Sequence, residues 1–299
     1  MKVPWRATIV EVGPRDGLQN EAASISTADK VAFVDKLSDA GHRVVEVSAF
    51  VSPRWVPQMA DAADVFASIR RREGTRYTAL VPNLSGLDRA VAANVDEVAI
   101  FAAASETFSR RNINQSIAES LKTYRQVCVK ASERGLPVRA YVSTAFGCPF
   151  EGTVPPERVA EVSAALAEMG AYQIAVSDTI GIAHPGQVPA VIGAVNQRVP
   201  LDRIALHFHD TRGTALANVL AALDLGVTTF DASAGGLGGC PYAPGATGNL
   251  ATEDLLYMLN GLGVETDVDL DKAVEASRFM EDRIGHPLPS RFLRASRSR

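Results

Sequence analysis

Residues 138–177 read VRAYVSTAFGCPFEGTVPPERVAEVSAALAEMGAYQIAVS, and this stretch decides the fold class of the chain. It contains a short apolar run, Val138–Val142, a segment with helical apolar spacing, Glu157–Glu168, and a second apolar run, Gln173–Ser177. Short, mostly apolar runs are typical of strands buried on both faces of a parallel sheet, and apolar residues at i, i+3 and i+4 indicate a helix. The stretch therefore predicts a strand–helix–strand unit with parallel strands.

The same alternation continues outward from this unit along the chain. The predicted strands are Ala7–Val12, Val44–Ser48, Tyr77–Val81, Glu97–Phe101, Val138–Val142, Gln173–Ser177, Ile204–His209 and Thr228–Ser233. The clearest predicted helices are Ala28–Ala40, Ile117–Arg134, Glu157–Glu168 and Ala215–Leu225. Eight such units in a row predict a closed (β/α)8 TIM barrel, an α/β fold, and an open doubly wound sheet is the alternative.

The whole chain, residues 1–299, is predicted to form one domain. No Pro/Gly/Ser-rich linker divides it, its apolar content is 46%, and barrels of this kind commonly reach this length. We expect the barrel to occupy about residues 5–265. The segment 266–299 is expected to add one C-terminal helix, beginning near Leu270, that packs against the barrel.

The amino-acid composition limits which binding partners and which cellular compartment are expected. The net charge is −4, and Lys and Arg are scattered, so no nucleic-acid partner is expected; the basic tail Arg291–Arg299 is interpreted as a solvated terminus. Three cysteines without close spacing argue against a disulfide framework and a zinc knuckle. No apolar run reaches the length of a membrane span, and Met1–Arg6 leaves no room for a targeting peptide. A soluble, cytoplasmic protein is expected, and the commonness of two-fold assemblies favours a homodimer.

Two histidines mark the end of the seventh predicted strand, and catalytic groups of such barrels lie at the carboxyl ends of the strands. Residues i and i+2 of a strand point to the same face, so His207 and His209 project together. This spacing favours a metal site over a pair of core histidines, which is the alternative. Asp210 points to the other side and is expected to support the loop.

Charged residues also follow the first two predicted strands. Gly13–Gly17 contains Arg15 and Asp16 within turn-forming residues, and barrel closure would place Asp16 near the histidine pair. A surface ion pair is the alternative for Arg15 and Asp16. Glu46 lies inside the second strand, where a carboxylate is costly unless paired. A structural salt bridge and a role in the site are both open for Glu46, and Arg15 can satisfy either.

The segment after the eighth predicted strand reads GGLGGCPYAPGATGN, residues 235–249. This glycine-rich and proline-rich loop is predicted to be mobile and is too long for a plain connector. Cys240 at its centre is a candidate acid or base, and an incidental cysteine is the alternative. Asn249 stands near a helix start, so its side chain serves either as an N-cap or as a metal ligand.

Two imidazoles, a carboxylate and an amide oxygen form a mixed nitrogen–oxygen ligand set. The four candidate ligands are Asp16, His207, His209 and Asn249. Such a set suits a divalent cation of the Mg²⁺ or Mn²⁺ type, and the lack of thiolate ligands argues against structural zinc. Substrate oxygens would fill the open positions, where the cation acts as a Lewis acid and a template.

These segments together resemble the 3-hydroxy-3-methylglutaryl-CoA lyases, within the wider group of barrel metallolyases and Claisen synthases named for an Asp-Arg-Glu constellation. The matching segments are Val10–Glu21, Glu46, Phe50–Pro53, Trp55–Met59, Asn112–Asn114, Gly147–Pro149, Asp178–Gly181, His207–Asp210 and Gly235–Asp254. They span nearly the whole chain. The strand-seven pair suits the whole group, whereas the cysteine loop and Gln19–Glu21 look specifically like the lyases.

The resemblance implies an activity and a role for each candidate residue. The implied metal ligands are Asp16, His207, His209 and Asn249. Arg15 would neutralise the carbonyl or enolate oxygen where negative charge develops, and Glu46 would hold Arg15 in place. Cys240 would transfer a proton over the substrate, with Asp178 as a second acid–base candidate. The implied reaction is retro-Claisen cleavage of an acyl-CoA, 3-hydroxy-3-methylglutaryl-CoA, to acetyl-CoA and acetoacetate, as in leucine degradation and ketone body formation.

Two departures concern the thioester side of the pocket. Relatives commonly carry a Lys at the position of Ala22 and a Ser at the position of Ala175. The resemblance therefore specifies the acyl-chain preference and the CoA contacts less well than it specifies the metal site. Arg110 and Arg111, after the fourth strand, either serve CoA phosphates or are simply solvated.

Three other functions are alternatives to this lyase. The first is a lyase for a longer 3-hydroxyacylglutaryl-CoA. The second is a Claisen-condensing synthase of the isopropylmalate or homocitrate type, which the cysteine loop and the short segment after Cys240 disfavour. The third, outside enzymes, is a metal-binding barrel that has lost catalysis.

Overall fold

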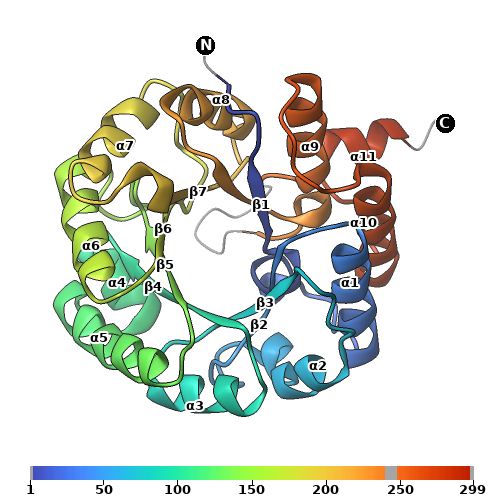
Figure 1. Ribbon diagram of the computed structural model, residues 1–299, viewed down its shortest axis with the longest axis horizontal. Helices are drawn as coiled ribbons and strands as arrows, with labels where there is room; N and C mark the ends of the chain where they lie inside the picture. The colour runs from blue at the N-terminus through green and yellow to red at the C-terminus, as the bar shows by residue number, and fades with distance from the viewer. Residues whose placement is uncertain (1–2, 240–247, 297–299) are drawn as a thin grey trace.

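The computed structural model describes residues 3–239 and 248–296. Eight parallel strands form a closed barrel in which each strand pairs with the next in sequence and β1 pairs with β8. Helices surround this ring, and the chain runs once around it from blue to red (Figure 1). Closure confirms the predicted TIM barrel and rules out the open doubly wound sheet.

The strands are short and the helices vary in length. The strands are β1 (Thr8–Glu11), β2 (Val44–Ala49), β3 (Arg76–Leu80), β4 (Glu97–Ala103), β5 (Val138–Ser143), β6 (Gln173–Asp178), β7 (Ile204–Phe208) and β8 (Thr229–Ala232). The α-helices are α1 (Thr27–Asp39), α2 (Ala62–Ser68), α3 (Leu84–Ala92), α4 (Glu106–Ile113), α5 (Ile117–Glu133), α6 (Pro156–Glu168), α7 (Val188–Asn196), α8 (Ala215–Leu225), α9 (Thr252–Gly261), α10 (Leu270–Ile284) and α11 (Arg291–Ala295). Short η turns are η1 (Gly13–Gly17), η2 (Leu18–Asn20), η3 (Pro57–Met59), η4 (Leu201–Arg203) and η5 (Ala234–Gly236).

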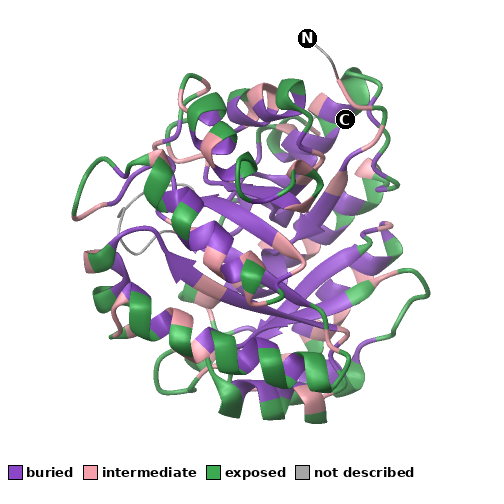
Figure 2. Cartoon of the chain, turned by 60° about the vertical axis from the view of Figure 1, so that its left-hand side comes forward, coloured by how far each residue is buried: buried purple, intermediate pink, exposed green. Residues whose placement is uncertain are grey.

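Each predicted strand is present, and its ends differ from the prediction by no more than about two residues. The stretch quoted first forms β5, α6 and β6, and β5 and β6 are parallel neighbours. Strands are almost wholly buried, whereas the surrounding helices bury one face and expose the other (Figure 2). Apolar runs without alternation therefore identified the strands correctly because both strand faces are covered.

Local sequence signals fix several helix ends. Ser116 begins α5 with a capping box, in which its hydroxyl accepts from the Glu119 amide while the Glu119 carboxylate accepts from the Ser116 amide. Gly226 ends α8 with a φ of 95°, a left-handed conformation that favours glycine. These signals make the helix bounds readable from the sequence.

The predicted C-terminal helix is present as α10 and begins at Leu270, and the short helix α11 follows it. The connection between them reaches back to the barrel: the Ser290 amide donates to the Gly235 carbonyl at 3.0 Å. The C-terminal segment thus lies against the loop that follows β8. In the part of the chain that the structure describes, no helix is both long and apolar enough to span a membrane.

Candidate functional site

The loop after β1 presents Arg15 and Asp16 from a wide turn at the carboxyl end of the strand. The turn, η1, is a π-helical turn in which the amides of Asp16 and Gly17 both donate to the Val12 carbonyl, at 2.8 and 3.2 Å. Such turns are rare and occur often at functional sites. Arg15 is buried, and the side chain of Asp16 is 16% exposed.

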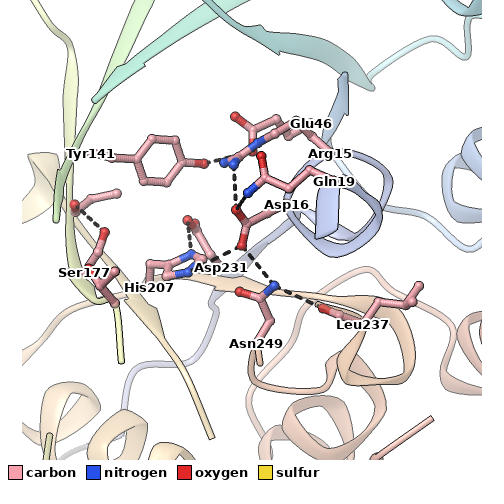
Figure 3. A network of polar contacts seen from close by, with 12 residues as sticks. Arg15, Asp16, Gln19, Glu46, Tyr141, Ser177, His207, Asp231, Leu237 and Asn249 are labelled. Atoms are coloured by element: carbon pink, nitrogen blue, oxygen red, sulfur yellow. Dashed lines mark hydrogen bonds and ion pairs between the residues drawn. The ribbon is translucent and has the colours of Figure 1, made fainter. Parts of the chain in front are cut away.

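Asp16, His207 and His209 converge as the sequence predicted. Figure 3 shows Asp16 beside His207. One ligand atom from each residue lies within 4.8 Å of the others. His207 Nε2 lies 3.9 Å from Asp16 Oδ2, and the two imidazole rings are 5.2 Å apart between centroids. The convergence arises because β1 pairs with β8, and β8 pairs with β7, which ends at the histidine pair.

Asn249 joins this cluster, and it is not a helix cap. Its Nδ2 donates to Asp16 Oδ2 at 2.9 Å and to the Leu237 carbonyl at 3.0 Å, and its backbone forms an isolated bridge with His209. The N-cap of α9 is Ala251 instead. Gly238 permits this arrangement, because a Cβ at that position would lie 2.7 Å from Asn249 Nδ2. The geometry therefore contradicts the N-cap interpretation of Asn249, and its role as a metal ligand stays a prediction.

The residues present fit a divalent cation. Among the described residues, two buried polar atoms here have no hydrogen-bond partner: Nδ1 of His209 and Oδ1 of Asn249. Buried polar atoms without a partner are costly in folded proteins, and an imidazole nitrogen and an amide oxygen are both metal-ligand atoms. Together with the Asp16 carboxylate, they make this cluster a candidate metal site.

The charges of the cluster favour metal binding. Burial raises the pKa of Asp16, but the neighbouring Arg15 and the two histidines lower it overall to about 2, so the carboxylate is ionised at neutral pH. Burial, assisted by the nearby His207, lowers the pKa of His209 to about 3, so that imidazole is neutral. An ionised carboxylate and a neutral imidazole are the forms that bind a metal ion.

Arg15 is held beside this cluster by the buried Glu46. Arg15 Nε donates to Glu46 Oε2 at 2.8 Å, and its Nη1 donates to Asp16 Oδ1 at 2.5 Å. The hydroxyl of Tyr141 also donates to Glu46 Oε2, at 3.2 Å. Burial opposes the charge of Arg15, but the carboxylates of Glu46 and Asp16 raise its pKa above the usual value. Glu46 therefore forms a buried salt bridge with Arg15 beside the cluster, and its role in the site stays a prediction.

Asp178 occupies a different environment from the other candidates. Its Oδ1 accepts from the Ile182 amide at 3.0 Å and its Oδ2 accepts from the Ala183 amide at 2.9 Å. Burial raises its pKa to about 6. The carboxylate thus fixes the loop after β6, and its acid–base role stays a prediction.

The remaining residues singled out from the sequence are Cys240, Arg110, Arg111 and Asp210. Cys240 lies outside the described residues, so its role also stays a prediction. Arg110 pairs with Glu106 at 3.1 Å, and the Arg111 guanidinium lies 4.3 Å from the centroid of the Phe150 ring. Asp210 supports the start of α8, as expected, by accepting from the Ala215 amide at 3.0 Å.

Sequence reasoning missed four buried polar residues that surround the cluster: Glu11, Arg139, Tyr141 and Asp231. The criterion that singled out Glu46, a charged side chain inside an apolar strand, applies equally to Glu11, Arg139 and Asp231. Applied along every predicted strand, it would have found all three.

Glu11 ties the loop after β1 to the loop after β8. Its Oε1 accepts from the amides of Gly13 and Ala234 at 2.8 and 2.9 Å, and its Oε2 accepts from the Thr252 hydroxyl at 2.7 Å. Burial raises its pKa to about 8, although these three donors oppose the shift. The two loops that carry candidate ligands therefore share one buried carboxyl group.

Replacing Glu11 with Gln should change how stability depends on pH. The folded-state pKa of about 8 exceeds the ordinary value of 4.5, so the folded protein binds this proton more tightly, and stability falls as pH rises from about 4.5 to 8. Glu11→Gln removes this titration. The melting temperature of the variant should therefore fall less than that of the wild type between about pH 6 and pH 8.5. Calorimetry at both pH values measures this difference. Glu253, whose pKa burial raises to about 7, titrates in both proteins. Equal losses would contradict the raised pKa of Glu11.

The family model described as HMGL-like matches residues 6–280. A 3-hydroxy-3-isohexenylglutaryl-CoA/hydroxymethylglutaryl-CoA lyase of Pseudomonas aeruginosa is 51% identical over 295 residues, which cover 99% of this chain and 98% of the relative.

Solved structures agree with the sequence relatives. The HMG-CoA lyase of Bacillus subtilis is 50% identical, superposes with a TM-score of 0.98, and the match covers 99% of this chain and 100% of that one. An HMG-CoA lyase of Acinetobacter baumannii in complex with coenzyme A and 3-methylmalate is 38% identical with a TM-score of 0.93, and the match covers 99% and 97%. With its eight-stranded barrel and its Asp-His-His cluster, the chain belongs to the HMGL-like family.

Proposed function

We propose that this protein is a hydroxymethylglutaryl-CoA lyase, a carbon–carbon lyase that cleaves 3-hydroxy-3-methylglutaryl-CoA to acetyl-CoA and acetoacetate. The observation that carries the proposal is the cluster of Asp16, His207, His209 and Asn249 beside the buried Arg15. Full-length relatives at about half identity bear the names of such lyases. They favour the bond-breaking reaction over the bond-forming synthases.

The proposed ligands are the Asp16 carboxylate, the two imidazoles and the Asn249 amide oxygen, and Mg²⁺ or Mn²⁺ is the cation that this set suits. The buried ion pairs around the cluster favour a cation. Arg15 pairs with Asp16 and Glu46, and Arg139 pairs with Asp231, so carboxyl groups outnumber arginines by one. When bound, the cation would polarise substrate oxygens as a Lewis acid.

The reaction breaks the bond between C2 and C3 of the substrate. Removal of the proton from the C3 hydroxyl turns C3 into the ketone carbon of acetoacetate, and the bonding electrons move to C2 as the enolate of acetyl-CoA. Arg15 would face the thioester oxygen, where negative charge accumulates, while Glu46 keeps the guanidinium in position. Protonation of C2 then completes acetyl-CoA.

Two residues are proposed for these proton transfers, Cys240 and Asp178. Cys240 would exchange a proton with the substrate from the loop after β8. Asp178, with a pKa of about 6, would be close to the operating pH for an acid–base group. Its two hydrogen bonds to loop amides support a structural part in the same residue.

The proposed activity is tested by incubating the purified protein with Mg²⁺ and 3-hydroxy-3-methylglutaryl-CoA and measuring acetoacetate. Cleavage that requires the added cation is the expected result. Metal binding without any cleavage would instead indicate the catalytically inactive barrel.

A longer acyl chain is the second candidate substrate, because the 51% identical Pseudomonas relative is named for both 3-hydroxy-3-isohexenylglutaryl-CoA and hydroxymethylglutaryl-CoA. Ala175 lies inside the barrel wall on β6, where its register partners are Tyr141 and Ala205. The small side chain of Ala175 does not by itself select between the two acyl chains. The ratio of kcat/KM for the two thioesters would decide between them.

Cys240→Ser should retain metal binding and lose cleavage by about two orders of magnitude or more, since a hydroxyl is a far weaker acid than a thiol. The rate of the variant and the sites of alkylation in the wild type test this together. Cys128 and Cys148 are buried, so alkylation is expected at Cys240, and saturating substrate should protect it. Full activity in Cys240→Ser would leave Asp178 as the proton-transfer candidate.

A further inference from the structure

Asp231 on β8 lies directly behind one of the candidate metal ligands. Its Oδ2 is 3.2 Å from Nδ1 of His207, and both side chains are buried. The opposite ring nitrogen, Nε2, faces Asp16 at 3.9 Å. The imidazole of His207 is therefore bracketed by two carboxylates, one on the side of the candidate metal and one behind it (Figure 3).

Asp231 is itself held by a buried arginine. Arg139 Nη2 donates to Asp231 Oδ1 at 2.6 Å, and its Nη1 donates to Oδ2 at 3.1 Å. A bidentate pair of this kind fixes the plane and direction of the carboxylate. Arg139 also donates from Nε to Gln173 Oε1 at 2.9 Å, and its guanidinium lies 4.9 Å from the centroid of the Tyr141 ring. The arginine thus has few alternative positions.

The second histidine of the cluster differs, because in the described structure its Nδ1 is left free for a metal ion, whereas Nδ1 of His207 faces Asp231. Among the described residues, Nδ1 of His209 has no hydrogen-bond partner, although it is buried. Both imidazoles occupy inward positions on β7 or directly after it, so their burial is similar and their surroundings differ. The carboxylate behind His207 is therefore a specific feature and does not follow from the strand geometry alone.

We propose that Asp231 is a positioning residue that accepts the Nδ1 proton of His207 and so leaves Nε2 as the metal-binding nitrogen, with Arg139 keeping Asp231 in place. The inference rests on the proposed metal site, and it assigns a function to two residues that the mechanism has not used. A carboxylate that accepts from the far nitrogen of a ligand histidine fixes the ring and its tautomer. Asp231 therefore acts through His207 and touches no substrate atom.

The positioning of His207 explains why the Arg139–Asp231 ion pair is kept in the barrel interior. Placing two charges away from water is costly, and apolar side chains of similar volume are often as stable there. A neutral acceptor can also orient an imidazole, but an amide can turn and donate to Nδ1 instead. The ionised carboxylate has only acceptor atoms, so it permits one tautomer.

Asp231→Asn tests the proposal with little change in volume. The Mn²⁺ dissociation constant of the substrate-free protein, measured by electron paramagnetic resonance, should rise about 10- to 100-fold, the usual effect of losing a residue that supports a metal ligand. Glu97→Gln is the matched control. Glu97 is a fully buried barrel carboxylate that pairs with Arg76 at 2.9 Å, and it contacts no candidate ligand in the described structure.

Comparing Asp231→Asn with Glu97→Gln distinguishes a positioning role of Asp231 from a general effect on stability. Both variants lose a buried carboxylate that pairs with an arginine, Arg139 being buried and Arg76 half exposed, so thermal melts should show a loss in each, while Mn²⁺ affinity should fall only in Asp231→Asn. Equal changes in affinity in both variants, or none in Asp231→Asn, would overturn the proposal. Because no substrate is present, failure of the lyase activity would not affect this outcome.

A measurement on the wild-type protein remains decisive if Asp231→Asn does not fold. Nitrogen-15 NMR of the Mg²⁺-loaded protein distinguishes the two neutral imidazole tautomers, and the His207 resonance is assigned by its loss in His207→Gln. A proton on Nδ1 of His207 is the expected result. A proton on Nε2 would exclude both the hydrogen bond to Asp231 and metal binding through that nitrogen.

Discussion

His207→Ala should reduce turnover to background and should weaken Mg²⁺ or Mn²⁺ binding by more than about 100-fold, because it removes a ligand and not merely its support. His207 supplies a ligand atom that lies within 4.8 Å of those of Asp16 and His209, at the centre of the cluster. The measurements are the rate of acetoacetate formation and the metal content after dialysis. His209→Ala should behave alike.

Two other histidines provide matched controls for this result. His184 is exposed, and His286 is half exposed and pairs with Glu21 at 2.9 Å. Alanine at either position should leave metal content unchanged and activity within about two-fold, as is usual for surface substitutions. Unchanged activity together with unchanged metal content in His207→Ala would refute the metal assignment.

Arg15→Gln should lower kcat by about two to four orders of magnitude, while KM changes much less. The expected pattern follows from a guanidinium that meets negative charge formed only during bond cleavage. Steady-state kinetics with 3-hydroxy-3-methylglutaryl-CoA provides both constants. A defect confined to KM would identify Arg15 as a substrate anchor instead.

Arg15 also contacts Asp16, so metal affinity must be measured in the same variant. An unchanged affinity would assign the loss of kcat to the missing guanidinium. Arg43→Gln is the control. Arg43 is largely exposed, pairs with Asp267 at 2.6 Å and precedes the amino end of β2, far from the catalytic end of the barrel. Its kinetic constants should stay near those of the wild type.

The fold could be predicted from the sequence because both faces of every barrel strand are covered. Runs such as Val138–Val142 and Gln173–Ser177 are consequently mostly apolar without an alternating pattern, and the helix between them keeps a clear period. The convergence of Asp16 with the histidine pair also followed, since a closed ring brings the first strand beside the last. Strand order therefore determined most of the candidate site.

Hydrogen bonds within the site were less accessible to sequence reasoning. The side chain of Asn249 is aimed at Asp16 by loop geometry, and the pairing of Arg139 with Asp231 joins residues 92 positions apart. Asp178 follows a strand, as catalytic residues do, yet its carboxylate accepts two amides of its own loop. Spacing along one strand specifies a face, but partners from other strands depend on register and side-chain direction.

The position of the cluster across the β1–β8 junction has a consequence for folding. Asp16 and Asn249 are 233 residues apart in sequence, so the ligand set is complete only when the two ends of the barrel have met. Bringing such distant segments together costs chain entropy, and a cation bound between them offsets part of that cost. Ring closure and metal affinity are therefore thermodynamically linked. Loosening the β1–β8 pairing would lower the apparent affinity, and metal would in turn protect the junction from opening.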